Sequence, residues 1–115
     1  MTLRMTERNV NGVGVLVLEG RIVLGEESSS FREKVKSLVA AGKKKIVLDL
    51  ANVSYIDSAG LGVLVAAFHS AHSQGGTLKL ANLGQNFNEV LQMTKLMTVF
   101  DTYSNEEAAI QSFQS

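Results

Sequence analysis

The sequence predicts a small α/β fold in which helices pack on a mixed β-sheet. Strand-like and helix-like segments alternate along the chain, which is typical of sheets whose strands are joined by helices. Residues 46–50 (IVLDL) are almost continuously apolar, as expected of a central strand covered on both faces. The pair Asn11-Gly12 separates two strand-like segments and indicates an antiparallel hairpin. The sheet is therefore expected to combine parallel and antiparallel strands.

The first half of the chain predicts a hairpin followed by one helix. Residues 3–8 and 13–19 are strand-like, Gly20 is expected to break the second strand, and residues 21–24 suit a short third strand. The helix start is predicted at a capping box formed by Ser30 and Glu33, or one turn earlier near Glu26. Gly42 suits the C′ position. Residues 43–45 are lysines, which can mark a binding patch, but a solvated helix C-terminus is the better interpretation. One face of this helix is apolar, at Phe31, Val35, Leu38 and Val39.

The second half predicts three more helices and two more strands. After the central strand and a short polar connection, a helix buries Leu61, Leu64, Val65 and Phe68. Gly75-Gly76 ends this region, and residues 77–81 form a strand with Leu78 and Leu80 on one face. Residues 86–93 form a helix with Asn86 and Glu89 at capping spacing and with inward side chains at Phe87, Val90 and Leu91. Residues 98–100 read as a short strand. Ser104 and Glu107 are expected to cap a last helix that carries Ala109, Ile110 and Phe113. We expect this helix to pack on the sheet, and the alternative is that it presents Phe113 to a partner.

Composition limits the classes of function. The 115 residues predict one domain over 1–115, with 45% hydrophobic and 19% charged residues, as in ordinary soluble proteins. Eleven basic residues balance eleven acidic ones, so neither nucleic-acid binding nor direct membrane contact is expected. The chain has no cysteine, which excludes disulfides and thiolate chemistry. No segment predicts a membrane span or a signal peptide, so a cytoplasmic protein is expected.

The candidate site follows the central strand and reads Asp57-Ser58-Ala59-Gly60-Leu61-Gly62. Ligands of open α/β sheets bind beyond the carboxyl ends of the strands, and a helix N-terminus favours an anion. Asp57 and Ser58 are both good N-caps, so capping alone is one explanation of the pair. Gly60 and Gly62 disfavour the helix they lie in. They either leave the backbone around Ser58 open to another protein or allow tight packing of the helix on its own sheet.

Other chemistries fit the sequence poorly. His69 and His72 share a helix face but no carboxylate stands at zinc-ligand spacing beside them, and a helix edge is the better interpretation. Ser58 lacks the G-x-S-x-G context of a hydrolase nucleophile. No phosphate-binding G-x-x-x-x-G-K-[ST] loop occurs. We expect neither an enzyme nor a bound metal or cofactor.

In its setting between a strand and a helix, the segment from Asp57 to Gly62 resembles the D-S-[ST]-G-L-G signature of the STAS family, which includes anti-sigma factor antagonists and a domain of sulphate transporters. The resemblance extends over nearly the whole chain, including the Gly20 segment, the Gly75-Gly76 turn and residues 78–80. A chain of this length looks most like the antagonist branch.

The resemblance implies a phosphorylation switch. In the family, the unphosphorylated antagonist binds an anti-sigma factor, which is also a serine kinase with a histidine-kinase-like ATP fold, and sigma factor is released. Phosphorylation of the motif serine ends the complex, and a PP2C-type serine phosphatase restores it. On this chain the acceptor is Ser58, with Asp57 as the acidic neighbour that contacts the kinase, and residues 57–62 as the partner-binding segment.

Two positions depart from the family pattern. Ala59 stands where many members have a second hydroxyl, which leaves Ser58 as the one acceptor of the motif. Val23 replaces the acid of a common G-E-L-D stretch, for which Glu26 or Glu27 are candidate substitutes. The alternative function is a STAS scaffold subunit, in a transporter or lipid-trafficking complex, in which Ser58 is only a helix cap. An esterase dependent on Ser58 is the third possibility.

Overall fold

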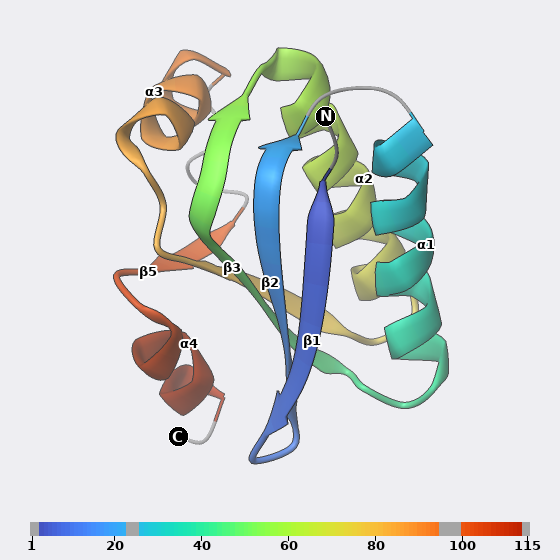
Figure 1. Ribbon diagram of the computed structural model, residues 1–115. Coiled ribbons are helices and arrows are strands. Elements are labelled where there is room, and N and C mark those ends of the chain that lie inside the picture. The colour runs from blue at the N-terminus through green and yellow to red at the C-terminus, as the bar shows by residue number, and fades with distance from the viewer. Residues whose placement is uncertain (1–2, 23–25, 95–99, 114–115) are drawn as a thin grey trace.

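The computed structural model describes residues 3–22, 26–94 and 100–113, and it has the predicted mixed sheet with helices on it (Figure 1). The strand order is β1-β2-β3-β4-β5. β1 pairs antiparallel with β2, and the other neighbouring pairs are parallel. The strands are β1 (Arg4–Val10), β2 (Val13–Ile22), β3 (Lys45–Ile56), β4 (Thr77–Ala81) and β5 (Asp101–Tyr103). The helices are α1 (Glu26–Ala40), α2 (Ser58–Ser73), α3 (Gln85–Thr94) and α4 (Glu106–Ser112).

The predicted hairpin is confirmed. Asn11 and Gly12 have φ angles of 52° and 82°, the left-handed values that a two-residue turn of type I′ requires. Seven residue pairs follow in regular register, from Val10 opposite Val13 to Arg4 opposite Glu19. This hairpin makes β1 one edge of the sheet.

Strands β2 and β3 both run further than the sequence predicts. β2 does not end at Gly20: it bends there, with a φ of 114° and a shift of register, and continues to Ile22. The short third strand predicted over 21–24 is therefore the end of β2, and its residues 23 and 24 lie outside the described part. The predicted polar connection after residue 50 is also wrong, because β3 continues to Ile56 alongside β2. Among the described strands, β2 alone pairs with this half of β3, so the polar side chains there can stay exposed.

Helix α1 starts at Glu26, so the earlier of the two predicted starts is right and the capping box at Ser30 is wrong. The predicted apolar face is buried, at Phe31, Val35, Leu38 and Val39. Gly42 takes the C′ position with a φ of 96°. The N–H groups of Gly42 and Lys43 donate to the carbonyls of Val39 and Leu38, which is a Schellman motif.

The later elements agree with the predictions in kind, with shifted boundaries. The strand expected at residues 98–100 lies at Asp101–Tyr103, and residues 98 and 99 are outside the described part. α3 begins at Gln85, one residue before the predicted capping position. Asn105, not Ser104, caps α4, because its side chain accepts the Ala108 N–H at 2.7 Å. Both asparagine and serine are good caps, so the sequence alone does not separate these neighbours.

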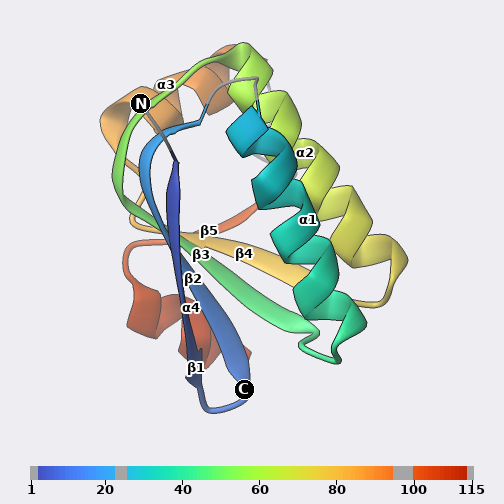
Figure 2. The ribbon, with the colours of Figure 1, turned by 45° about the vertical axis from the view of Figure 1, so that its right-hand side comes forward.

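The helices divide between the two faces of the sheet. α1 and α2 cover one face, and α4 lies on the other (Figure 2). The larger core lies under α1, α2 and α3 and includes Leu16, Leu48 and Leu64. The smaller core lies under α4, where Ala109 and Ile110 are buried against the valines of β2 and β3. The last helix thus packs on the sheet as predicted. No helix of the described ranges is long and apolar enough to cross a membrane.

Candidate functional site at the start of α2

The candidate site lies where the central strand β3 meets helix α2. β3 ends at Ile56, Asp57 is extended with φ −114° and ψ −177°, and α2 begins at Ser58. The Asp57 carboxylate accepts the Gly60 N–H at 2.7 Å, and the Asp57 carbonyl accepts the Leu61 N–H at 2.9 Å. Asp57 is therefore the N-cap of α2, and its charge also suits the positive end of the helix.

Ser58 is the first residue of α2, and its side chain is exposed. Because Asp57 caps the helix, the Ser58 hydroxyl is not needed for capping, and no described residue forms a hydrogen bond with it. The explanation of Ser58 as a simple helix cap therefore does not hold. The hydroxyl stands at a helix N-terminus, accessible to a reagent that approaches from solvent.

The two glycines of the motif have different roles. At Gly60 a Cβ atom would lie 1.8 Å from the Ile22 carbonyl oxygen and 2.6 Å from its carbon, so α2 packs against the end of β2 through bare backbone. For this position the tight-packing alternative is the right one. Gly62 is exposed, and an added Cβ would meet no atom of the described residues within 4 Å. Packing against the part of the chain that the structure describes thus does not explain why position 62 is a glycine.

Four of the six predicted site residues reach the surface. Ser58, Ala59 and Gly62 are exposed and Asp57 is half-buried. Gly60 and Leu61 are buried, because they face the core. Val23, one of the two departures from the family pattern, lies outside the described part. The side chains of its candidate substitutes, Glu26 and Glu27, also lie outside it.

An aromatic–cation pair next to the motif was not predicted. Tyr55 is 40% exposed, and the Arg21 guanidinium lies 5.2 Å from the centre of its ring. The two residues are neighbours in the β2–β3 pairing, and Ser54 beside them donates its hydroxyl to the Gly20 carbonyl at 3.2 Å. The available signal was a tyrosine within a polar stretch of the sequence. The sequence does not predict that this stretch is a strand, and only the strand pairing places Tyr55 beside Arg21.

The two histidines are exposed and lie along an aromatic row on α2. The His69 and His72 rings lie 5.7 and 6.1 Å from the ring of Phe68. Within the described residues, no three side chains of His, Asp or Glu gather in a way that suits a metal ion.

Comparison with known proteins gives one consistent result. The STAS domain model matches residues 5–109. The anti-sigma-B factor antagonist of Bacillus subtilis is 38% identical over 80 residues, which cover 70% of this chain and 72% of that protein. The crystal structure of TM1081 from Thermotoga maritima superposes with a TM-score of 0.86 at 27% identity, covering 96% of this chain and 95% of that one. The unphosphorylated SpoIIAA structure covers 99% of both chains, with a TM-score of 0.71 at 18% identity, and thus shares the fold.

Proposed function

Because the chain belongs to the STAS domain family, we propose that it is an anti-sigma factor antagonist whose binding is switched off by phosphorylation of Ser58. The proposed kinase is the anti-sigma factor itself, with a histidine-kinase-like ATP fold, and the proposed reset enzyme is a PP2C-type phosphatase. The observation that carries the proposal is the exposed Ser58 hydroxyl, which the cap Asp57 leaves available. The name of the Bacillus relative supports the same class of partner.

A phosphate on Ser58 is compatible with the fold. It adds about −1.5 to −2 charges at neutral pH. The positive N-terminus of α2 stabilises the phosphate by roughly 0.3–1 kcal/mol. Repulsion from the Asp57 carboxylate at about 5 Å costs roughly 1 kcal/mol per unit charge in water and roughly 3 kcal/mol at an effective dielectric of 20. Since Ser58 is exposed, the lower figure applies. The modified chain is expected to stay folded.

A partner seated over Ser58 responds differently to the same charge. An interface buries the groups at its centre, and an unpaired phosphate there costs several kcal/mol. About 4 kcal/mol corresponds to a thousandfold loss of affinity. Phosphorylation of Ser58 would thus change the stability of the fold little and the affinity for the partner strongly, as a switch requires.

The exposed small residues of the first two turns support a partner at this surface. Ala59 and Gly62 are both exposed, so the partner backbone can approach α2 closely beside Ser58. Gly62 lowers helix stability by up to about 1 kcal/mol relative to alanine, and no contact with the described residues accounts for it. Close approach of a partner backbone would explain why this position has no side chain.

The test is a pull-down from native lysate with four baits, read by mass spectrometry. Wild type and Ser58→Ala are expected to recover an ATPase of the histidine-kinase-like class, and Ser58→Asp is expected to lose it. The control Ser37→Asp adds the same charge at an exposed position of α1 and should bind as wild type does. Incubation of the recovered kinase with ATP should phosphorylate wild type and leave Ser58→Ala unmodified.

Equal recovery of one partner by all four baits would contradict the switch. If that partner is a transporter or lipid-trafficking subunit, the chain is a scaffold. Loss of binding by Ser37→Asp as well would show that charge anywhere on the surface is enough, and the special role of Ser58 would fail.

A further inference from the structure

Arg21 and Tyr55 stand together on the surface, at the carboxyl ends of strands β2 and β3. They are partners in the register of the two strands, and the Arg21 guanidinium lies 5.2 Å from the centre of the Tyr55 ring. Arg21 is exposed, and Tyr55 is one of two exposed large hydrophobic side chains among the described residues. A single exposed ring is common on protein surfaces. A ring that is ordered by a neighbouring cation and lies beside a candidate site is a more specific feature.

The pair lies on the face of the sheet opposite α1 and α2. The next residues of the two strands, Ile22 and Ile56, are buried in the larger core under these helices. Because successive side chains of a strand point to opposite faces, Arg21 and Tyr55 lie on the other face. Helix α4 covers that face near the first residues of β2, such as Val13. The described residues therefore leave the pair open to solvent, at the end of the sheet where the motif begins.

The pair is close enough to Ser58 to belong to the same interface. Tyr55 lies three residues before Ser58, so their Cα atoms are at most roughly 11 Å apart. Arg21 precedes Ile22, whose carbonyl oxygen would be 1.8 Å from a Cβ at Gly60 in the first turn of α2. Figure 1 shows the ends of β2 and β3 and the start of α2 at the same end of the molecule. A standard interface covers about 800 Å² of each partner, a patch with a radius of roughly 15 Å, so an interface centred on Ser58 includes Tyr55.

On the basis of the proposed function, we propose that Arg21 and Tyr55 anchor the anti-sigma factor ATPase that binds over Ser58. The ring fills an apolar recess on the partner, and the guanidinium pairs with a carboxylate at the rim of that recess. Ser58 then controls whether the complex forms, and the pair supplies much of its affinity. The partner thus has a second contact point, outside the motif of residues 57–62.

The chemistry of the pair suits an anchor. Tyrosine and arginine are enriched among the few residues that carry most of the binding energy of an interface. No carboxylate of the described residues forms an ion pair with Arg21. Its guanidinium can therefore take a carboxylate from a partner through two parallel hydrogen bonds while it stays stacked on the Tyr55 ring.

The pair is also held in place before any partner binds. Strand pairing fixes the backbone of both residues, and the Ser54 hydroxyl beside them donates to the Gly20 carbonyl at 3.2 Å. The contact between the Arg21 guanidinium and the Tyr55 ring restricts both side chains. Side chains that are already ordered lose less conformational entropy when they enter an interface.

The affinity of purified variants for the ATPase that the wild-type bait recovers tests the anchor, by isothermal titration calorimetry without ATP, so that Ser58 stays unmodified. Tyr55→Ala is expected to bind at least about 30-fold more weakly, and Tyr55→Phe should bind as wild type does. Arg21→Gln should bind about tenfold more weakly. The control Lys45→Gln removes one positive charge at the exposed start of β3, roughly 30 Å from Tyr55, and should bind as wild type does. Each variant should melt within about 4 °C of wild type, which shows that the fold is kept.

A second readout needs no variant. The chain contains two tyrosines, Tyr55 and Tyr103. With carbon-13 in the tyrosine rings of wild type and an unlabelled ATPase, the NMR signals of Tyr55 should shift on binding. Those of Tyr103, on strand β5 at the other edge of the sheet, should stay in place.

The outcomes separate the anchor from the switch. If Ser58→Asp loses the ATPase while Tyr55→Ala binds it as tightly as wild type, the anchor is refuted and the proposed switch is not. If the wild-type bait recovers no ATPase of this class, both fail, because the anchor then has no partner. Equal weakening by Lys45→Gln would remove the special role of Arg21. A Tyr55 signal that shifts with protein concentration alone would assign the pair to a contact between two copies of the chain, and would also overturn the proposal.

Discussion

Substitution of Gly60 and Gly62 by alanine tests the structure of the site, because the two changes are chemically identical and lie two residues apart on α2. At Gly60 the new Cβ would stand 1.8 Å from the Ile22 carbonyl oxygen. This oxygen and the Ile22 carbonyl carbon, at 2.6 Å, are backbone atoms of β2, which is held in the sheet by its pairing with β3. Helix α2 would therefore have to move by roughly 1 Å or more in a closely packed interior. Overpacking of this kind costs about 3 kcal/mol, and the helix propensity gained returns about 1.

We therefore expect Gly60→Ala to lose about 2 kcal/mol of unfolding free energy and to melt roughly 8 °C lower. The new Cβ of Gly62→Ala has no atom from residues 3–22, 26–94 or 100–113 within 4 Å, so this variant should gain up to about 1 kcal/mol, or roughly 4 °C. Urea denaturation followed by circular dichroism measures both. If Gly60→Ala is as stable as wild type, α2 does not approach β2 as described. If Gly62→Ala is destabilised, Gly62 has a structural role and no longer supports a partner at this surface.

Three further predictions concern the caps and the attachment of α4. Asp57→Ala removes the cap of α2 and should cost about 1 kcal/mol of unfolding free energy in the same denaturation assay. Asn105→Ala should cost a similar amount, whereas Ser104→Ala should be neutral, and the reverse order would reassign the cap. Lys79→Met removes the bond to Ser112 and the ring contacts and should lower stability by about 1 kcal/mol, with faster amide exchange confined to α4.

Local patterns in the sequence were enough for the kind and order of the elements. The left-handed pair Asn11-Gly12, the apolar face of α1 and the C′ glycine Gly42 each depend on neighbouring residues only, and each agrees with the structure. The end of β3 was missed because polar residues there are held in a strand by pairing with β2, which no local pattern records. Tertiary pairing outweighs local preference in such strands.

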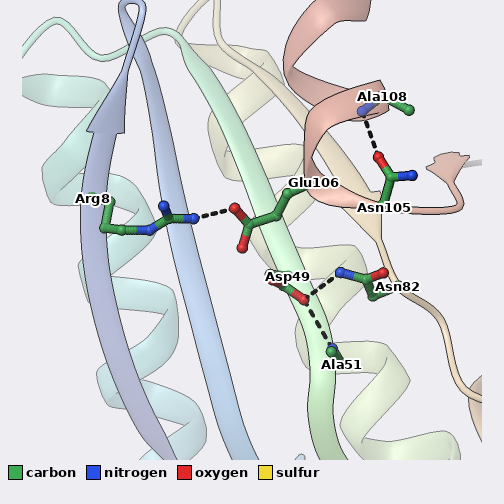
Figure 3. Close-up of polar contacts among 7 residues, drawn as sticks. All are labelled: Arg8, Asp49, Ala51, Asn82, Asn105, Glu106 and Ala108. Atoms are coloured by element: carbon green, nitrogen blue, oxygen red, sulfur yellow. Dashed lines mark hydrogen bonds and ion pairs between the residues drawn. The ribbon is translucent and has the colours of Figure 1, made fainter.

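The site was predictable in position, and its internal geometry was not. The motif places Ser58 after a strand, but which residue caps α2 depends on the backbone angles of Asp57. The role of Gly60 depends on Ile22, a residue of a different strand. The surroundings of Asp49 were missed for the same reason, since the Asn82 amide that donates to this buried carboxylate follows a different strand, β4 (Figure 3). A single aspartate inside the apolar run of residues 46–50 was the available signal.

Because Asp57 caps α2 and Ser58 is the proposed acceptor, phosphorylation does not have to change the hydrogen bond that starts the helix. If Ser58 were the N-cap, phosphorylation would change the hydrogen bond that starts α2, and the fold would lose up to about 1 kcal/mol together with the partner. Asp57 takes that role instead, through its bond to the Gly60 N–H. The bond between the Asp57 carboxylate and the Gly60 N–H does not use the hydroxyl that a phosphate on Ser58 would modify. In the proposed switch, a modification of Ser58 can therefore act mainly on the complex, and the modified chain stays folded as a substrate for the proposed phosphatase.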